Sequence, residues 1–265
     1  LNIKWTKKLK NECKKNNIDF FTSAYDFELV DQVDPYVPCY KIGSGDITYL
    51  EIIKKIAKKN KPYILATGAA NLSDVTRAVK ACYKINKKFS LMQCNTNYTG
   101  SLENFKYINL KVLQLYKKKF PNIILGLSDH TKDHATVLGA VTLGARIVEK
   151  HFTDNRKRIG PDHKFSMMPR DWKTMVDRTR ELELSLGNNL KKVEKNELQT
   201  VILQRRALRA KINLLKKNKI KKFDIIALRP CPKNAIPPYE LNKIINKKLK
   251  KNILKGDIIK WSDLI

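Results

Sequence analysis

The sequence has few of the features that mark secreted or membrane-bound proteins. Its 265 residues include five cysteines, without paired C-x-x-C spacing and too sparse for a disulfide scaffold, so we expect reduced thiols. No apolar run reaches the length of about 18 residues that spans a bilayer, and the opening stretch LNIKWTKKLK lacks the apolar core of a signal peptide. We therefore expect a cytoplasmic protein with no membrane partner.

Acidic residues are also scarce: 25 Asp and Glu face 54 Lys and Arg, a formal charge of +29. Such a charge raises the possibility of a nucleic-acid or anionic-membrane partner. However, the lysines are spread along the whole chain on expected helix surfaces and turns, and are enriched together with asparagine and isoleucine. This pattern fits compositional drift, so we expect no specific nucleic-acid binding, while an anionic substrate is compatible with the charge.

Short β-rich runs alternate with helical patterns up to about residue 186, which is typical of βαβ units around a parallel sheet. Six strands are expected, at Ile18–Thr22, Cys39–Ile42, Tyr63–Thr67, Ser90–Asn95, Ile123–Leu127 and Arg146–His151. Helices are expected at Trp5–Lys15, Leu50–Lys58, Leu72–Lys84, Leu102–Lys118, Ala135–Leu143 and Pro169–Leu186.

Polar residues follow nearly every expected strand, which is the layout of the active face of a TIM barrel. Such a barrel has eight strands, so the α/β fold class that we expect is a TIM (β/α)8-type barrel with six of its eight units present. The chain begins at Leu1 with a helix that no strand precedes, and the missing units would be the two N-terminal βα units. An open doubly wound sheet is the alternative, but it gathers ligands at one switch point rather than from every strand end.

Three regions are expected along the chain. Residues 1–186 would form the partial barrel, and the polar stretch 187–203 would be a linker. Residues 204–265 contain short β-type runs and clustered prolines, which indicate a small, mostly β domain.

Two histidines stand at the ends of neighbouring expected strands. In an extended strand Glu149 and His151 share a face and Lys150 points to the other. Likewise, Ser128 and His130 share a face that Asp129 does not. A carboxylate beside imidazoles at a strand end suggests metal binding or acid/base chemistry. His134, four residues after His130, could form a helical metal pair, but a surface position on a helix is the simpler interpretation.

Five motifs, taken together and in order, closely resemble the sialic acid synthase family over essentially the whole chain. They are KIGSGD at 41–46, ATG at 66–68, GLSDHT at 126–131, EKHFT at 149–153 and GPDH at 160–163. The resemblance implies a TIM barrel followed by an antifreeze-like SAF domain at 204–265. It also implies condensation of phosphoenolpyruvate with N-acetylmannosamine or a related N-acetylated hexosamine, giving a nonulosonic acid and phosphate.

By the same resemblance, His130 and His151 would be the protein ligands of a divalent cation, Mn²⁺ or Mg²⁺, with water and the sugar aldehyde in other positions. Glu149 would contact the amino sugar and could manage protons. The residues expected to bind phosphoenolpyruvate are Lys41, Ser44, Thr67 and Ser128, with Thr22 and Thr96 nearby.

The remaining sugar contacts implied by the resemblance are Tyr98, Asp162 and Arg229, the last from the partner subunit of a domain-swapped homodimer. Two departures from the family pattern bear on these contacts. The loop RPCPKNAIPP lacks the glycines usual after its Arg-Pro pair. The stretch CNTNYTG at 94–100 differs from the commoner proline-bearing loop, and this second difference leaves the acceptor sugar open.

Three other interpretations remain at this point. The chain could be a truncated, catalytically inactive relative that binds sugar or metal. It could be a Schiff-base aldolase that uses Lys41 or Lys150, although strand alternation directs Lys150 toward the outer helices. Finally, it could be a basic nucleic-acid module, which salt-sensitive binding would reveal.

Overall fold

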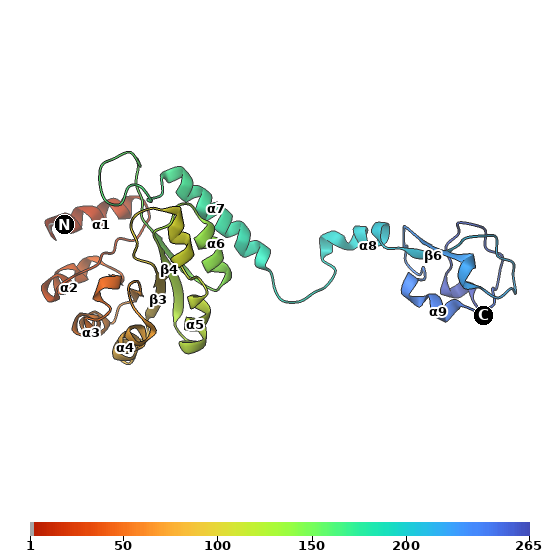
Figure 1. Ribbon diagram of the computed structural model, residues 1–265, viewed down its shortest axis with the longest axis horizontal. Coiled ribbons are helices and arrows are strands. Elements are labelled where there is room, and N and C mark those ends of the chain that lie inside the picture. The colour runs from red at the N-terminus through yellow and green to blue at the C-terminus, as the bar shows by residue number, and fades with distance from the viewer. Residues whose placement is uncertain (1–2) are drawn as a thin grey trace. The chain divides into compact units, whose positions relative to one another are not determined.

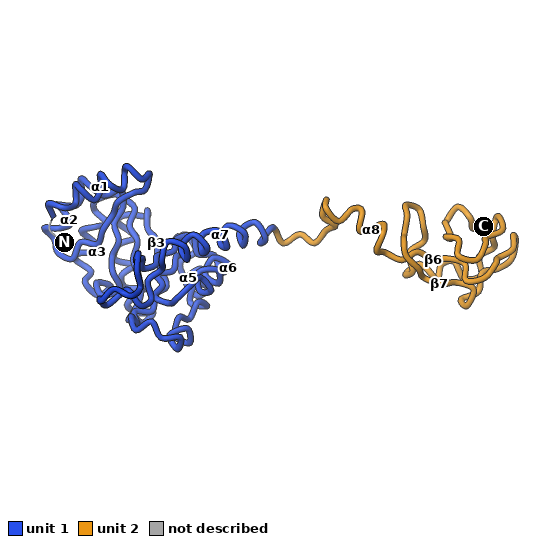
Figure 2. The backbone as a smooth tube through the Cα atoms, turned by 90° about the horizontal axis from the view of Figure 1, so that it is seen from above, with its two compact units in different colours: residues 1–187 blue, residues 188–265 orange. Residues whose placement is uncertain are grey.

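The computed structural model describes residues 3–265, which form two compact units divided between Gly187 and Asn188 (Figure 2). The first unit is an α/β domain and the second is a smaller domain with its own core. Within residues 3–265, no helix is both long enough and apolar enough to cross a membrane.

A curled, five-stranded parallel sheet forms the centre of the first unit (Figure 1). Its strands are β1 (Tyr40–Ile42), β2 (Tyr63–Ala66), β3 (Phe89–Cys94), β4 (Ile124–Asp129) and β5 (Ile147–Lys150). They pair in sequence order, each parallel to the next. Because every crossover is made by a helical segment and all strands run in one direction, their carboxyl ends meet at one edge of the sheet. This arrangement is a half-barrel of the TIM type.

Helices cover the outer face of this sheet (Figure 1). The α-helices of the first unit are α1 (Thr6–Lys15), α2 (Phe27–Val33), α3 (Leu50–Lys58), α4 (Leu72–Tyr83), α5 (Val112–Lys119), α6 (Ala135–Thr142) and α7 (Pro169–Leu186). Short 3-10 turns occur at η1 (Ile3–Trp5), η2 (Asp34–Tyr36), η3 (Ser44–Asp46) and η4 (Leu102–Tyr107). Fully buried Leu65, Leu91 and Leu127 point from the strands into a core completed by Ile53 of α3 and Leu113 of α5. Burial of each such side chain contributes roughly 1.5–3 kcal/mol to folding.

One expected strand of the first unit is absent from the described residues 3–187, so five strands form its sheet and not six. Residues 18–22 run without regular structure and make no ladder with β1. Their backbone has no strand partner within the described chain, and the side chains of Ile18 and Phe21 are 61% and 40% exposed. A strand requires such a partner for its N–H and C=O groups, so an apolar composition alone did not produce one.

The prediction of one continuous helix at Leu102–Lys118 is also wrong. The structure divides it into η4 and α5, with Asn109 between them at a φ of 50°. Asparagine tolerates this left-handed conformation better than most residues, because its short polar side chain bonds locally. The break turns the Tyr107 carbonyl toward the Asn95 side chain, whose Nδ2 donates to it over 3.3 Å.

The second unit is built around short antiparallel pairings. Strand β6 (Ala207–Ala210) pairs with β7 (Ile225–Leu228), and isolated bridges join several other segments. Its helical segments are η5 (Lys195–Glu197), α8 (Leu198–Gln204), η6 (Lys222–Asp224), η7 (Pro238–Glu240), α9 (Leu241–Ile244) and η8 (Trp261–Asp263). Thus η5 and α8 occupy part of the segment expected to be linker. Leu208, Ile236, Ile244 and Ile259 are almost fully buried in the core of this unit.

Candidate functional site

The inner face of the sheet carries a group of polar side chains where β4 and β5 end. Ser128 and Glu149 are directly opposite each other in the strand register. Ser128 Oγ donates a hydrogen bond to Glu149 Oε1 over 2.9 Å, and Lys41 Nζ lies 3.4 Å from the same oxygen. We call these three residues the carboxylate cluster. Lys41 is 9% exposed, so its charge and that of Glu149 meet in a partly desolvated setting where electrostatic attraction is stronger than in water.

Directly beyond the strands, four rings gather into a second group, the histidine cluster. It consists of Tyr98, His130, His151 and Phe165. The imidazole centroids of His130 and His151 are 5.1 Å apart, Tyr98 lies 4.3 Å from His130, and Phe165 lies 5.0 Å from His151. The two histidines expected at adjacent strand ends therefore do face each other.

A hydrogen bond determines which ring nitrogen of His130 carries the hydrogen. Its Nδ1 lies 2.7 Å from the carbonyl oxygen of Asn95. A carbonyl can only accept, so Nδ1 carries the hydrogen and Nε2 keeps a lone pair. Burial lowers the pKa of His130, with the nearby His151 adding to the effect against the opposing bond to Asn95. A neutral imidazole with a free Nε2 is the form that binds metal ions.

The loop after β5 folds back onto the strand end and delivers two members of the site. Met167 N donates to His151 O over 2.8 Å, and Thr153 N donates to Met167 O over 2.9 Å. This return places Asp162 Oδ2 3.5 Å from His151 Nδ1 and buries Phe165 to 1% exposure against both imidazoles. Sequence reasoning missed Phe165, because an isolated aromatic residue in a polar loop has no periodic signal; its position between GPDH and α7 was the only hint.

The loops after β1, β2 and β3 converge around Gly68. A Cβ atom on Gly68 would lie 2.3 Å from Thr96 Cγ2, 2.9 Å from Ser44 Oγ and 3.1 Å from Cys94 Sγ. Ser44 Oγ also accepts a hydrogen bond from Gly68 N over 2.9 Å. Burial raises the pKa of the Cys94 thiol, although hydrogen bonds with Ser44 and Ser128 oppose the shift, so the thiol stays protonated. Ser44 is thus connected to Ser128 of the carboxylate cluster through Cys94, and Thr96 lies on the same side of Gly68 as Ser44 and Cys94.

Two of the expected site residues, Thr67 and Thr22, make no hydrogen bond or ion pair with either cluster in the described structure, and a third, Arg229, belongs to the second unit. Thr67 Oγ1 donates to Met92 O over 2.9 Å and accepts from Tyr116 over 3.0 Å, on the outer side of the sheet. Thr22 lies in the irregular segment before α2, where its hydroxyl is 3.5 Å from Ser23 O. Arg229 is an exposed residue of the second unit, directly after β7.

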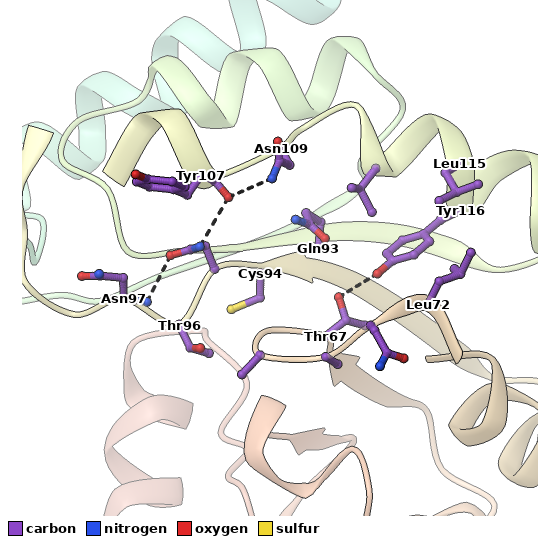
Figure 3. Close-up of a pocket in the computed structure, with 15 residues that line it drawn as sticks. Thr67, Leu72, Gln93, Cys94, Thr96, Asn97, Tyr107, Asn109, Leu115 and Tyr116 are labelled. Carbon is purple, nitrogen blue, oxygen red and sulfur yellow. Dashed lines mark hydrogen bonds between the residues drawn. The ribbon is translucent and has the colours of Figure 1, made fainter. Parts of the chain in front are cut away.

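A cavity of about 660 Å³, whose lining residues are drawn in Figure 3, includes no member of the histidine cluster in its lining. Thr67, Cys94, Thr96 and Tyr116 line it, with Asn95, whose carbonyl accepts from His130. Its wall is rich in amide and hydroxyl groups, and none of its lining residues is charged. The cavity therefore suits neutral polar groups, whereas the charged side chains Lys41 and Glu149 meet in the carboxylate cluster.

Lys150 belongs to neither cluster and is bound in a buried ion pair. Its side chain is 1% exposed and its Nζ lies 2.8 Å from Asp129 Oδ2 on the outer face, as strand alternation predicted. An ammonium held in this way is a poor Schiff-base nucleophile, because the amine must first lose its proton. His134 precedes α6 as its N-cap, and makes no contact with the His130 and His151 rings in the described structure.

Within residues 3–265, no group of three or more His, Cys, Asp or Glu side chains is arranged to hold a metal ion. The paired imidazoles could supply two nitrogen ligands, and the lone pair on His130 Nε2 fits that use. Any cation here would take its other ligands from water or substrate.

Comparison with known proteins assigns the chain to a family. Residues 1–191 match the NeuB family model. The N,N'-diacetyllegionaminic acid synthase of Campylobacter jejuni is 34% identical over 264 residues, covering 98% of this chain and 77% of the relative. The synthase of the same name from Legionella pneumophila is 34% identical over 253 residues, covering 93% of this chain and 69% of the relative.

A solved structure supports the same assignment. The N-acetylneuraminic acid synthetase of Leptospira borgpetersenii, crystallised with citrate, superposes with a TM-score of 0.69 at 29% identity, covering 76% of this chain and 70% of that one. The resemblance inferred from the five motifs is thereby confirmed, and this chain belongs to the NeuB family of sialic-acid-type synthases.

Proposed function

We propose that this protein condenses phosphoenolpyruvate with an N-acetylated hexosamine to give a nonulosonic acid and inorganic phosphate. The observation that carries the proposal is the meeting of Lys41, Ser128 and Glu149 beside the paired imidazoles of His130 and His151. An anion-binding cation, a hydroxyl donor, a carboxylate and two metal-type ligands are the groups that this reaction requires at one place.

Lys41 and Ser128 would bind the anionic groups of phosphoenolpyruvate. Both contact Glu149 Oε1, and this convergence on one carboxylate oxygen supports the proposal that the ammonium and the hydroxyl bind an anion together. Ser44 and Thr96 would extend the donor set from the neighbouring loops. We also propose Thr67 and Thr22 as substrate contacts; Thr67 would need to exchange its bond with Tyr116 for one to substrate.

The amino sugar would lie between Tyr98, Glu149 and Asp162. In the reaction, C3 of phosphoenolpyruvate bonds to the aldehyde carbon of the sugar, and the aldehyde oxygen takes up a proton. The new bond uses the C2=C3 π electrons and leaves C2 electron-poor. Water then adds at C2 and gives up a proton, and the tetrahedral centre becomes a ketone as its C2–O bond to phosphate breaks and phosphate leaves with the second proton. Glu149 would hold or move a proton at Oε1, and the burial of Lys41 would strengthen its attraction for the substrate charge.

His130 and His151 would hold the divalent cation, Mn²⁺ or Mg²⁺. When bound, such a cation supplies Lewis acidity toward the aldehyde oxygen and orients water. Asn95 and Asp162 would orient the two rings through their contacts to the Nδ1 atoms, since the partner of the second ring nitrogen commonly fixes a ligating histidine.

We further propose that residues 204–265 are a SAF domain and that Arg229 reaches the sugar of a partner subunit in a swapped homodimer. The separate core of the second unit and the exposure of Arg229 support this proposal.

The test is phosphate release from phosphoenolpyruvate in the presence of Mn²⁺ and a panel of N-acetylated hexosamines. The His130→Ala variant should lose at least about 100-fold in kcat. His134→Ala is the matched control, because it removes a histidine four positions away that makes no contact with the other imidazoles, and it should retain wild-type turnover.

Other outcomes would replace the proposal. A folded wild-type protein that binds a sugar or Mn²⁺ without releasing phosphate would favour the inactive binding relative. A covalent adduct on Lys41 after borohydride trapping with pyruvate would indicate Schiff-base chemistry.

A further inference from the structure

We propose that the buried ion pair Asp129–Lys150 is a positioning device, which holds the ends of β4 and β5 in the register that makes His130 and His151 face each other. The proposal rests on the function proposed above for the two histidines. It assigns a role to two charged residues that do not touch the candidate substrate site.

The position of the pair in the chain is the first observation. Asp129 lies between Ser128 and His130, and Lys150 lies between Glu149 and His151. The two are direct register partners at the last rung of the β4–β5 ladder. Because side chains alternate, each member of the pair anchors the outer side of the strand whose inner side carries the site.

The bonding of the pair is the second observation. Lys150 Nζ donates to Asp129 Oδ2 over 2.8 Å, to Thr131 O over 2.7 Å and to Asp133 O over 2.8 Å, so all three ammonium hydrogens are used. The side chains of Lys150 and Asp129 are 1% and 0% exposed. Lys150 therefore joins the end of β5 both to β4 and to the carbonyl oxygens of Thr131 and Asp133 in the loop after His130.

The carboxylate is equally well satisfied. Asp129 Oδ2 accepts from Thr136 Oγ1 of α6 over 2.6 Å and from Thr131 Oγ1 over 2.9 Å, and its Oδ1 accepts from Thr131 N over 3.1 Å. A buried ion pair is tolerable only when its remaining donors and acceptors are bonded in this way, and a register role is the best-attested use of such pairs. A one-residue slip of β5 would turn His151 to the outer face, and the pair opposes that slip.

The experiment uses the full chain and three variants. Lys150→Met leaves the Asp129 carboxylate buried without its cation and is expected to be strongly destabilised. The double variant Asp129→Asn/Lys150→Met removes both charges and keeps an amide for Thr131 and Thr136, so it is the variant expected to fold. Thr136→Val is the matched control, since it removes one hydrogen bond to Asp129 and leaves the cross-strand pair intact.

The first readout is the set of imidazole signals in the NMR spectrum, which contains four histidines in all. In the folded double variant we expect the His130 Nδ1–H signal, which reports the bond to Asn95, to be lost or shifted together with the His151 signals. The His163 signals, which report the bond to Thr153, should stay in place. Thr136→Val should leave all four histidines as in the wild type.

The second readout is Mn²⁺ affinity measured by calorimetry, which we expect to fall at least about tenfold in the double variant. A folded double variant with wild-type imidazole signals and wild-type affinity would overturn the proposal. If the wild type itself binds no Mn²⁺, the proposed function fails, while the imidazole signals still decide the role of the pair. If the double variant does not fold, Asp129→Asn alone is measured, and unchanged imidazole signals would again overturn it.

Discussion

The hydroxyl of Ser128 donates to Glu149 Oε1 across the ends of two neighbouring strands, at 2.9 Å. Lys41, from the far edge of the same sheet, comes within 3.4 Å of that oxygen. One carboxylate oxygen is therefore shared by the two groups that we propose for anion binding, so charge at position 149 should affect catalysis and substrate binding differently.

For Glu149→Gln we expect kcat to fall about 100-fold or more, since an amide cannot take up or release the proton. The KM for phosphoenolpyruvate should stay equal or decrease, because the amide no longer competes with substrate for Lys41. Steady-state kinetics with both substrates measures this. Glu103→Gln is the control, because Glu103 forms an exposed ion pair with Lys106; an unchanged kcat in Glu149→Gln would contradict the assigned role.

A second prediction concerns Gly68. In Gly68→Ala, the new methyl group would meet Thr96, Ser44 and Cys94 at 2.3–3.1 Å, so the loops must separate. We expect about 1–3 kcal/mol of destabilisation in urea unfolding, together with weaker phosphoenolpyruvate binding. Gly45→Ala is the matched control, because a Cβ atom there meets nothing within 4 Å. Equal stability of the two variants would show that the loops do not pack as described.

Phe165 should matter for the two imidazoles and not only for the core. Phe165→Leu keeps an apolar side chain but removes the ring contacts with His130 and His151. We expect a loss of about 1 kcal/mol in stability and a measurable decrease in Mn²⁺ affinity by calorimetry. Phe105→Leu replaces a phenylalanine that is 37% exposed and serves as the control. An unaltered Mn²⁺ affinity in Phe165→Leu would show that Phe165 contributes to core packing only.

The first unit should lose stability in acid partly through Asp34. Burial opposes ionisation of this carboxyl, but the hydrogen bond from Tyr40 and the ammonium of Lys61 outweigh it and hold its pKa below the usual range. A lowered folded-state pKa stabilises the fold above the unfolded-state pKa of about 3.9, and this contribution is lost as pH falls through the folded-state value.

Tyr40→Phe tests this coupling. It should cost about 1 kcal/mol near neutral pH, and the difference from wild type should shrink below about pH 4 as Asp34 becomes protonated. Urea unfolding across the pH range measures both effects. Tyr36→Phe is the control, since the Tyr36 hydroxyl makes no hydrogen bond in the described structure; a pH-independent difference for Tyr40→Phe would exclude Asp34 as the cause.

Sequence patterns predicted the elements that have strong local signals. Helix α3 occupies Leu50–Lys58 and α7 occupies Pro169–Leu186, as expected from apolar periodicity and, for α7, from proline at its first turn. Alternation along β4 and β5 correctly separated Ser128 from Asp129 and Glu149 from Lys150. Helix periodicity and strand alternation are set by residues that are close in the chain, so they can be predicted from the sequence.

The errors arose where distant partners decide the structure. Residues 18–22 have strand-like composition, but composition cannot supply a neighbouring backbone. Asn109 ends a helical pattern without the glycine or proline that commonly marks such a break. Phe165 enters the site because a loop returns to its own strand, a contact that no periodicity encodes.

The loop that returns to the end of β5 should stay in place even when its backbone is cut. Its tip is exposed at Lys157, Arg158 and Ile159, so trypsin should cut there. Arg156, upstream of the cut, binds both Ser166 O and the Asp171 carboxylate downstream of it, and backbone bonds join Thr153 to Met167. The nicked protein should therefore remain assembled, with His151 on one fragment and Asp162 and Phe165 on the other.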